Sequence, residues 1–249
     1  MKMKRKAEKI LEVENLCKTY PEFQLQNISF CVERAVIMGM IGRNGAGKTT
    51  TMKSILHLVH PDSGEIRFFG QKLDQQDDDI RQRVGYASRG NVFYARKRIR
   101  EITDMTKCFY TNWDDQQYQR YMELFALEEN KKLKDLSEGM KVKYSLVLAL
   151  SHHAELLILD EPTSGLDPVS RQELLDIFQY LAKEGTAILF STHITSDLEK
   201  TADAITYIKD GAVVASKAYP QFLLDYPQEH TLEDIMVHLE RKPMQFDVR

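Results

Sequence analysis

The sequence predicts an α/β fold with a mostly parallel central sheet. Strand-like and helix-like segments alternate along the chain and are separated by turns that contain Gly or Pro. Residues 36–41, 155–160 and 187–191 are almost continuously apolar, which is typical of strands that are covered on both faces. The 249 residues suffice for one large domain or two smaller ones with a substantial core.

The N-terminal part of the chain contains four predicted strands and one predicted helix. The third strand stops at Gly42, where a glycine-rich loop begins and leads into the helix. The turn at residues 61–64 contains Pro, which fixes φ, and Gly, which permits a positive φ, and it leads into the fourth strand. The strands are predicted at residues 10–14, 28–32, 36–41 and 65–69, and the helix at residues 47–58.

Helical patterns replace strand patterns between about residues 89 and 151, which indicates a helical insertion in the sheet. We expect one domain over residues 1–225, which includes this insertion, and a helical extension over residues 226–249. The predicted helices of the insertion lie at residues 99–109, 115–126 and 140–150.

The C-terminal part returns to the alternating pattern. Asp167-Pro168 predicts a helix start, because Pro is favoured at the first helical position. Leu174, Phe178 and Leu181 would lie on one face of that helix. Asp210-Gly211 between two apolar runs predicts a β-hairpin. The remaining segments are strands at 155–160, 187–191, 205–209 and 212–216, and a final helix at 232–241.

The composition excludes several classes of protein. The net charge of −3 argues against a dedicated nucleic-acid binder, so no nucleic-acid partner is expected. No apolar run approaches the roughly 18 residues that span a bilayer, and the charged N-terminus leads into no apolar signal region. Three widely spaced cysteines match neither a disulfide framework nor a zinc site. We therefore expect a cytoplasmic protein.

The glycine-rich loop at residues 42–49 predicts a phosphate-binding site. It fits the pattern G-x-x-x-x-G-K-[ST], follows a buried strand and opens a helix, whose N-terminal N–H groups would bind phosphate oxygens. Lys48 would reach the β- and γ-phosphates, and the Thr49 hydroxyl would bind Mg²⁺. The alternative is a turn that matches the pattern by chance. The predicted nucleotide-binding residues here are Gly42, Asn44, Gly45, Ala46, Gly47, Lys48, Thr49 and Thr50.

Two adjacent carboxylates follow the apolar run at residues 156–159. Asp160 and Glu161 would lie at the carboxyl end of a strand, where open α/β sheets bind their ligands. Asp160 fits a Mg²⁺-associated carboxylate, and Glu161 fits a base that polarises the attacking water. An apolar run ending in Asp-Glu is a weak signal alone and a strong one downstream of a phosphate loop.

The ordered motifs resemble those of the ABC ATPase family over about residues 10–220. L-S-E-G-M at residues 136–140 resembles the family signature L-S-G-G-Q, and S-G-L-D at residues 164–167 resembles its D-loop. His193 occupies the position of the switch histidine, and Tyr20 that of the aromatic residue that stacks on adenine. The phosphate loop alone leaves kinases and small GTPases open, whereas the signature and His193 favour the ABC family.

The resemblance implies a fold, a mechanism and partners. The fold is a P-loop NTPase core with an N-terminal antiparallel β subdomain and an inserted α-helical subdomain. Two copies would bind two ATP molecules between them, and Ser137 and Gly139 of one copy would contact the nucleotide of the other. Glu161, His193 and Lys48 would be catalytic, with Mg²⁺ at Thr49 and Asp160.

The resemblance also implies a transmembrane permease subunit on a separate chain. The ATPase would then lie peripherally on the inner face of the cell membrane, as a homodimer or as a heterodimer with a similar ATPase. The phrases N-W-D at residues 112–114 and S-T-H-I at residues 191–194 resemble the branch that exports peptides and antibiotics.

Two residues depart from the family pattern. Arg89 stands where the family usually has a Gln that binds Mg²⁺, and a guanidinium cannot ligate a cation, although it can contact the γ-phosphate or a carboxylate. The alternative is that the equivalent position lies one or two residues away and that Arg89 is solvated. Glu138 places a carboxylate in the signature. We hypothesise that Glu138 and Arg89 pair across a closed dimer. The alternatives are a regulatory ABC subunit with weak hydrolysis and an ABC ATPase that does not serve transport.

Overall fold

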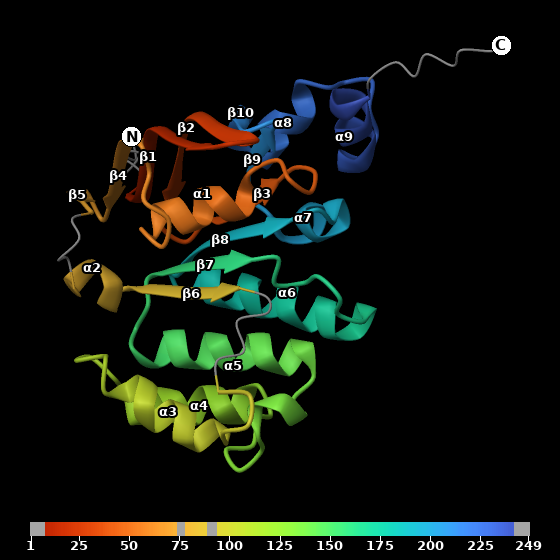
Figure 1. Ribbon diagram of the computed structural model, residues 1–249. Helices are drawn as coiled ribbons and strands as arrows, with labels where there is room; N and C mark the ends of the chain where they lie inside the picture. Colours follow the sequence, from red (N-terminus) through yellow and green to blue (C-terminus); the bar gives the residue numbers. More distant parts are fainter. Residues whose placement is uncertain (1–7, 74–77, 89–93, 242–249) are drawn as a thin grey trace, which may run out of the picture.

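The structure is a computed structural model that describes residues 8–73, 78–88 and 94–241. Two sheets form its centre (Figure 1). The antiparallel sheet consists, in spatial order, of β2 (Phe23–Glu33), β1 (Lys9–Tyr20), β4 (Ser63–Phe68) and β5 (Gln71–Lys72). The second sheet consists, in spatial order, of β10 (Ala212–Ala218), β9 (Ala204–Lys209), β3 (Ile37–Ile41), β8 (Ala187–Thr192), β7 (Leu156–Asp160) and β6 (Val84–Ser88).

The second sheet is parallel except at one edge. β6, β7, β8, β3 and β9 pair in parallel, and β10 pairs with β9 as the antiparallel hairpin expected around Asp210-Gly211. These pairings confirm the predicted α/β class, the mostly parallel sheet and the antiparallel sheet near the N-terminus.

The apolar strands are buried on both faces, as their composition predicts. Every residue of β3, β7 and β8 is buried. Within β7, Leu157 and Leu159 belong to the core shared with the helices, whereas Leu156 and Ile158 belong to the core shared with the antiparallel sheet. Successive side chains of one strand therefore supply two separate hydrophobic layers.

The first two predicted strands are much shorter than the observed ones. β1 and β2 span 12 and 11 residues and pair with each other along most of their length. The pairing register shifts between Val13 and Leu16, and Asn15 between them has a left-handed φ of 50°. Asn adopts this conformation more readily than most residues. The irregularity shifts the buried positions from Val13 to Leu16. Strict alternation is lost there, and the strand pattern in the sequence therefore ends early.

Helices cover the parallel sheet and form the predicted insertion. The three helices of the insertion begin and end close to the expected residues. Asp167 caps the next long helix by accepting from Val169 N and Ser170 N, with Pro168 at its first position as predicted. The helices are α1 (Lys48–Ile55), α2 (Asp78–Gln82), α3 (Ile99–Lys107), α4 (Asp115–Leu124), α5 (Glu138–Ser151), α6 (Pro168–Lys183), α7 (Thr195–Thr201), α8 (Tyr219–Leu224) and α9 (Leu232–Glu240).

The short helices escape prediction. α2, α7 and α8 have five, seven and six residues, which is too few for a periodic pattern to be recognised. In Figure 1, α3 and α4 lie farthest from the antiparallel sheet, and α5 separates them from β6 and β7. None of the helices among the described residues is long and apolar enough to cross a bilayer.

The C-terminal helix packs against the rest of the chain. Leu232 and Ile235 of α9 are fully buried. The Tyr207 hydroxyl donates to Glu240 Oε1 at 2.6 Å, and Glu199 Oε1 of α7 accepts from Leu232 N at 2.8 Å. The predicted extension is therefore docked on β9 and α7 through at least residue 240.

Phe178 provides a test of the packing between α6 and the sheet. Its side chain is fully buried, and its ring centroid lies 5.5 Å from that of Phe190 on β8. We expect Phe178→Ala to lower the free energy of unfolding by about 3–5 kcal/mol, because it removes buried area and leaves a cavity. Urea denaturation measures this change. Val169→Ala, at a position 68% exposed on the same helix, should have little effect, and a loss of similar size there would contradict this view of the core.

Candidate functional site

The parallel register brings several polar residues to one edge of the sheet. Asp160 at the end of β7 lies directly opposite Ser88 of β6 on one side and Ser191 of β8 on the other. Ile41, which ends β3, lies opposite Thr192 of β8. The loops that leave β3, β7 and β8 therefore start side by side, as expected for a ligand site in an open parallel sheet.

The glycine-rich loop joins β3 to α1 at this edge. Gly47 precedes α1 with a left-handed φ of 112°, and a Cβ atom there would lie 2.6 Å from Leu25 Cδ2 and 2.9 Å from Phe23 Cζ. Both the backbone conformation and the close approach of β2 require glycine. The start of α1 thus faces the site with free N–H groups, which favours binding of an anion.

Lys48 is folded over its own loop. Its side chain is 5% exposed, and Nζ donates to the carbonyl oxygens of Gly42 at 2.8 Å and Arg43 at 3.2 Å. Nζ also lies 3.5 Å from Oε1 of Glu161. The ammonium group therefore lies between the phosphate loop and the carboxylate that was predicted to be the base.

Asp160 accepts two hydrogen bonds from hydroxyl groups. The Thr49 hydroxyl lies 3.1 Å from Asp160 Oδ1, and the Ser191 hydroxyl lies 2.6 Å from the same oxygen. Thr49 and Asp160 are brought together from α1 and β7 as the motifs predict. Their hydroxyl and carboxylate oxygens are the hard donors that Mg²⁺ prefers, so this pair fits a Mg²⁺ site.

Glu161 is held in an uncommon backbone conformation. Its φ of 52° is left-handed, which costs roughly 1–3 kcal/mol for a residue other than glycine. Its N–H donates to the Ser191 hydroxyl at 2.9 Å, and its Oε2 lies 2.8 Å from His193 Nδ1. Glu161 and His193 are thus in contact, as expected of a base and the residue that orients it.

Ser191 is the residue that the sequence interpretation missed. Its hydroxyl donates to the Asp160 carboxylate and accepts from the Glu161 backbone N–H, so one side chain holds the carboxylate of Asp160 and the main chain of Glu161. A partial signal is present in the sequence, because Ser191 ends a predicted buried strand two residues before His193. The pairing of β7 with β8, which makes Ser191 face Asp160, cannot be inferred from that pattern.

A second buried acid lies behind the site. Asp197 of α7 is 1% exposed, and burial raises the pKa of its carboxyl group, whereas Thr163 and Arg171 act in the opposite direction. Arg171 Nε lies 4.0 Å from Asp197 Oδ1, and Arg171 Nη2 donates to Leu166 O at 3.4 Å. Asp197 and Arg171 therefore connect α7 to the loop that follows β7.

The predicted nucleotide residues surround an open cavity of about 720 Å³. Two residues predicted in the glycine-rich loop, Gly42 and Ala46, do not line it. Ala46 is buried, and the Gly42 carbonyl holds Lys48. Tyr20 is 37% exposed and does not line this cavity in the described part of the chain, where Phe23 does. The lining residues are Glu22, Phe23, Asn44, Gly45, Gly47, Lys48, Thr49, Thr50, Asp160, Glu161, Ser164 and His193.

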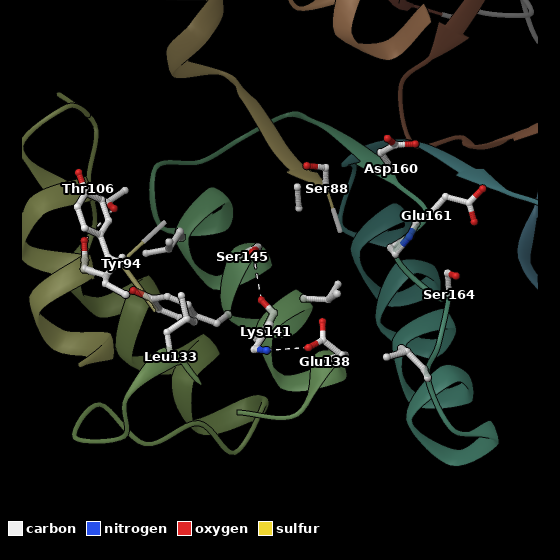
Figure 2. Close-up of a pocket in the computed structure, with 17 residues that line it drawn as sticks. Ser88, Tyr94, Thr106, Leu133, Glu138, Lys141, Ser145, Asp160, Glu161 and Ser164 are labelled. Atoms are coloured by element: carbon white, nitrogen blue, oxygen red, sulfur yellow. Dashed lines mark hydrogen bonds and ion pairs between the residues drawn. The ribbon is translucent and has the colours of Figure 1, made fainter. Parts of the chain in front are cut away.

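A smaller cavity of about 280 Å³ lies between this edge and the predicted insertion with its helices α3, α4 and α5, which we call the helical region (Figure 2). Figure 2 shows Asp160, Glu161 and Ser164 on one side of it and Tyr94 and Leu133 on the other. Asp160, Glu161 and Ser164 also line the larger cavity, so the two cavities share a wall.

The residues of the signature lie at the start of α5, beside the smaller cavity. Ser137 caps α5 by accepting from Met140 N at 3.2 Å, and it is exposed. Gly139 is buried, and a Cβ atom there would lie 3.4 Å from Ser170 Cβ on α6. Neither Ser137 nor Gly139 lines the larger cavity within the ranges that the structure covers.

The hypothesised pair of Glu138 and Arg89 is not tested by the structure, because Arg89 lies outside the described residues. Glu138 itself is half exposed and pairs with Lys141 of the same helix at 2.7 Å. This contact partly neutralises the unusual carboxylate of the signature within its own chain.

The chain is similar to known proteins of one family. A sequence profile described as "ABC transporter" matches residues 25–164. The chain is 35% identical to the bacitracin transport ATP-binding protein BcrA of Enterococcus faecalis, over 83% of this chain and 68% of that protein. It is 34% identical to the Nod factor export ATP-binding protein I of Burkholderia lata, over 81% and 67% of the two chains. A solved "ATP binding subunit of ABC transporter" is 29% identical, with a TM-score of 0.83 over 93% of this chain and all of that one.

The chain belongs to the ABC transporter family. It is an ATP-binding subunit of a membrane ABC transporter, and members of this class hydrolyse ATP to power transport.

Ser191 provides a test of the geometry of the site. Ser191→Ala removes the bonds to Asp160 and to the Glu161 backbone, and a hydrogen bond to a charged group contributes roughly 1.5–3 kcal/mol. If the whole of this free energy is lost from the stabilisation of the transition state, the kcat of ATP hydrolysis falls about 10- to 100-fold. The matched control is Ser151→Ala, because Ser151 is also buried but donates to Val147 O inside α5. Equal kcat values for the two variants would show that Ser191 does not organise the site.

Proposed function

We propose that the chain hydrolyses Mg²⁺·ATP to drive export through a membrane-spanning subunit carried on a separate chain. Two relatives support this proposal, because one is named for bacitracin transport and the other for Nod factor export. The single observation that carries the hydrolytic part is the contact of Glu161 with His193 beside Lys48 and the phosphate loop.

The residues divide the chemistry between them. Thr49 and Asp160 would hold Mg²⁺, and the bound ion would neutralise charge on the phosphate oxygens. Lys48 and the N–H groups at the start of α1 would bind the phosphates. Glu161 would accept the proton of the attacking water, and His193 would keep its carboxylate aligned.

Tyr20 would provide the stacking surface for adenine. It stands at the end of β1, two residues before Glu22, which lines the larger cavity. Its ring is already in contact with a cation, since Lys18 Nζ lies 5.8 Å from the ring centroid. Phe23 offers a second aromatic surface nearer to the phosphate loop.

Ser137 and Gly139 would act on the nucleotide of a second copy. Ser137 is exposed at the start of the 14-residue helix α5 and is absent from the described wall of its own nucleotide cavity. A helix N-terminus carries a partial positive charge, which would favour the γ-phosphate of a facing molecule. ATP binding would thus close a homodimer or a heterodimer, and phosphate loss would reopen it.

We further propose that the subunit works at the inner face of the cell membrane, where it contacts its permease. The alternative of a regulatory subunit with weak hydrolysis rests on Glu138 and Arg89. The contact of 2.8 Å between Glu161 and His193 favours hydrolysis instead.

Mixing two inactive variants tests the shared site. In a mixed dimer of Lys48→Ala and Ser137→Ala, one pocket combines two damaged elements and the other combines two intact ones. We therefore expect each mixed dimer to recover up to about half the activity of a wild-type dimer, because one of its two pockets is intact, whereas each variant alone stays inactive. The measurement is the rate of phosphate release against the mixing ratio.

The controls use the same variants unmixed and a mixture of Lys48→Ala with Glu161→Gln. Lys48 and Glu161 belong to the same pocket of one chain, so that mixture leaves no intact pocket and should stay inactive. An absence of recovery in the first mixture, with dimers present, would contradict a site shared between two copies.

A further inference from the structure

A basic ribbon lies on the helical region. The segments around residues 95–100 and 129–134 run antiparallel, with Leu133 N donating to Lys97 O at 3.0 Å and Ile99 N donating to Lys131 O at 2.9 Å. Lys134 N also donates to Ala95 O at 2.9 Å. Two stretches far apart in the sequence are thus paired at one isolated antiparallel bridge, beside the start of α3 and a 3₁₀ turn at Leu133–Asp135.

The ribbon has an apolar face and a basic face. Ile99 and Leu133 are buried in the core of the helical region. The remaining face is formed by exposed basic residues from both stretches. These are Arg96, Arg98, Arg100, Lys132 and Lys134, and we call them the basic face.

Like charges stand directly opposite each other on this face. Arg98 and Lys132 form an isolated antiparallel bridge. The flanking backbone bonds, from Leu133 to Lys97 and from Ile99 to Lys131, make this a non-hydrogen-bonded pair, in which side chains approach most closely. Like charges at such a position destabilise the pairing. This like-charge pair disfavours the local pairing, so its presence indicates a role other than stabilising the fold.

Nearby acids neutralise the basic face only in part: Glu101 accepts from Arg98 N at 2.8 Å, and Lys97 and then Arg98 lower the pKa of its carboxyl group. Residues 94–101 and 128–135 together carry seven basic and four acidic residues, for a net charge of +3 in a chain whose net charge is −3. Glu101 pairs with Lys97 and Glu128 pairs with Lys131, which lie outside the basic face. Among the described residues, no ion pair to Arg96, Arg98, Arg100, Lys132 or Lys134 is formed.

The shape of the surface favours an extended anionic partner. None of the five residues lines either cavity described above, so the charges do not converge on a small ligand. Tyr94, three residues before Lys97, lines the smaller cavity but is still 60% exposed, and its ring is of the amphipathic aromatic kind found at bilayer surfaces.

We propose that the basic face binds the anionic headgroups of the membrane beside the transporter. Clustered Lys and Arg residues are attracted to anionic lipid, each contributing about a fivefold gain in partitioning. The contact would hold the helical region at the lipid surface independently of nucleotide. It goes beyond the proposed function, because neither ATP hydrolysis nor the dimer requires it.

The test measures binding of the purified chain to lipid vesicles by flotation. We expect the wild type to bind vesicles that contain phosphatidylglycerol and not vesicles of phosphatidylcholine alone, with binding lost at high salt. The triple variant Arg98→Gln, Lys132→Gln, Lys134→Gln should partition about 100-fold more weakly, at about fivefold per residue.

The matched control is Lys72→Gln, Lys183→Gln, Lys200→Gln, which removes the same charge from exposed residues elsewhere. It should bind like the wild type, and both variants should keep their basal ATPase activity. The basic N-terminus is intact in all three proteins.

Two results would overturn the proposal. One is equal binding of the wild type and the basic-face variant to anionic vesicles. The other is a wild type that does not bind anionic vesicles, together with a basic-face variant that no longer co-purifies with its membrane subunit. The basic face would then bind protein and not lipid. Neither result bears on the mixed-variant test of the shared site.

Discussion

The parallel register of β3, β8 and β7 is the constraint on which the site depends. It places Asp160 opposite Ser191, and it starts the loops of Glu161, His193 and Lys48 at neighbouring positions of one sheet edge. A shift of one residue between β7 and β8 would turn Ser191 away from Asp160 and remove the hydroxyl that holds both the Asp160 carboxylate and the Glu161 backbone N–H. The strands need no polar residue before this edge. Each strand therefore has its buried apolar residues along its length and its polar site residues at its carboxyl end.

The wall between the two cavities couples the site to the helical region. Asp160, Glu161 and Ser164 face both the nucleotide cavity and the smaller cavity in front of α5. A change in the loop that carries these residues therefore alters both spaces. Asp197 and Arg171 hold the far end of the same loop through Leu166. The shared wall thus connects the larger cavity with the smaller cavity in front of α5.

Much of the fold and most of the site could be predicted from the sequence, for identifiable reasons. Buried parallel strands such as β7 are continuously apolar, and Pro168 and the loop at residues 42–49 have strong local preferences. β1 could not be bounded, because Asn15 shifts the alternation of its buried face. α7 was missed because it has only seven residues.

Contacts between distant segments escaped prediction. Ser191 became recognisable only through its pairing with β7, and the basic face through the pairing of residues 95–100 with 129–134. Tyr20 was chosen from its motif, whereas Phe23 lines the cavity in the structure. Local sequence thus specifies the chemical groups, and strand pairing decides which of them meet.

The central claim is that Asp160 and Glu161 divide the work, one binding Mg²⁺ and the other activating water. The most direct measurement compares Asp160→Asn with Glu161→Gln for Mg²⁺-dependent ATP binding and for hydrolysis. The account predicts that Glu161→Gln keeps Mg²⁺-dependent binding and loses about 10²- to 10⁴-fold in kcat, whereas Asp160→Asn loses the Mg²⁺ dependence itself. Wild-type hydrolysis by Glu161→Gln, or unchanged Mg²⁺ dependence in Asp160→Asn, would contradict it.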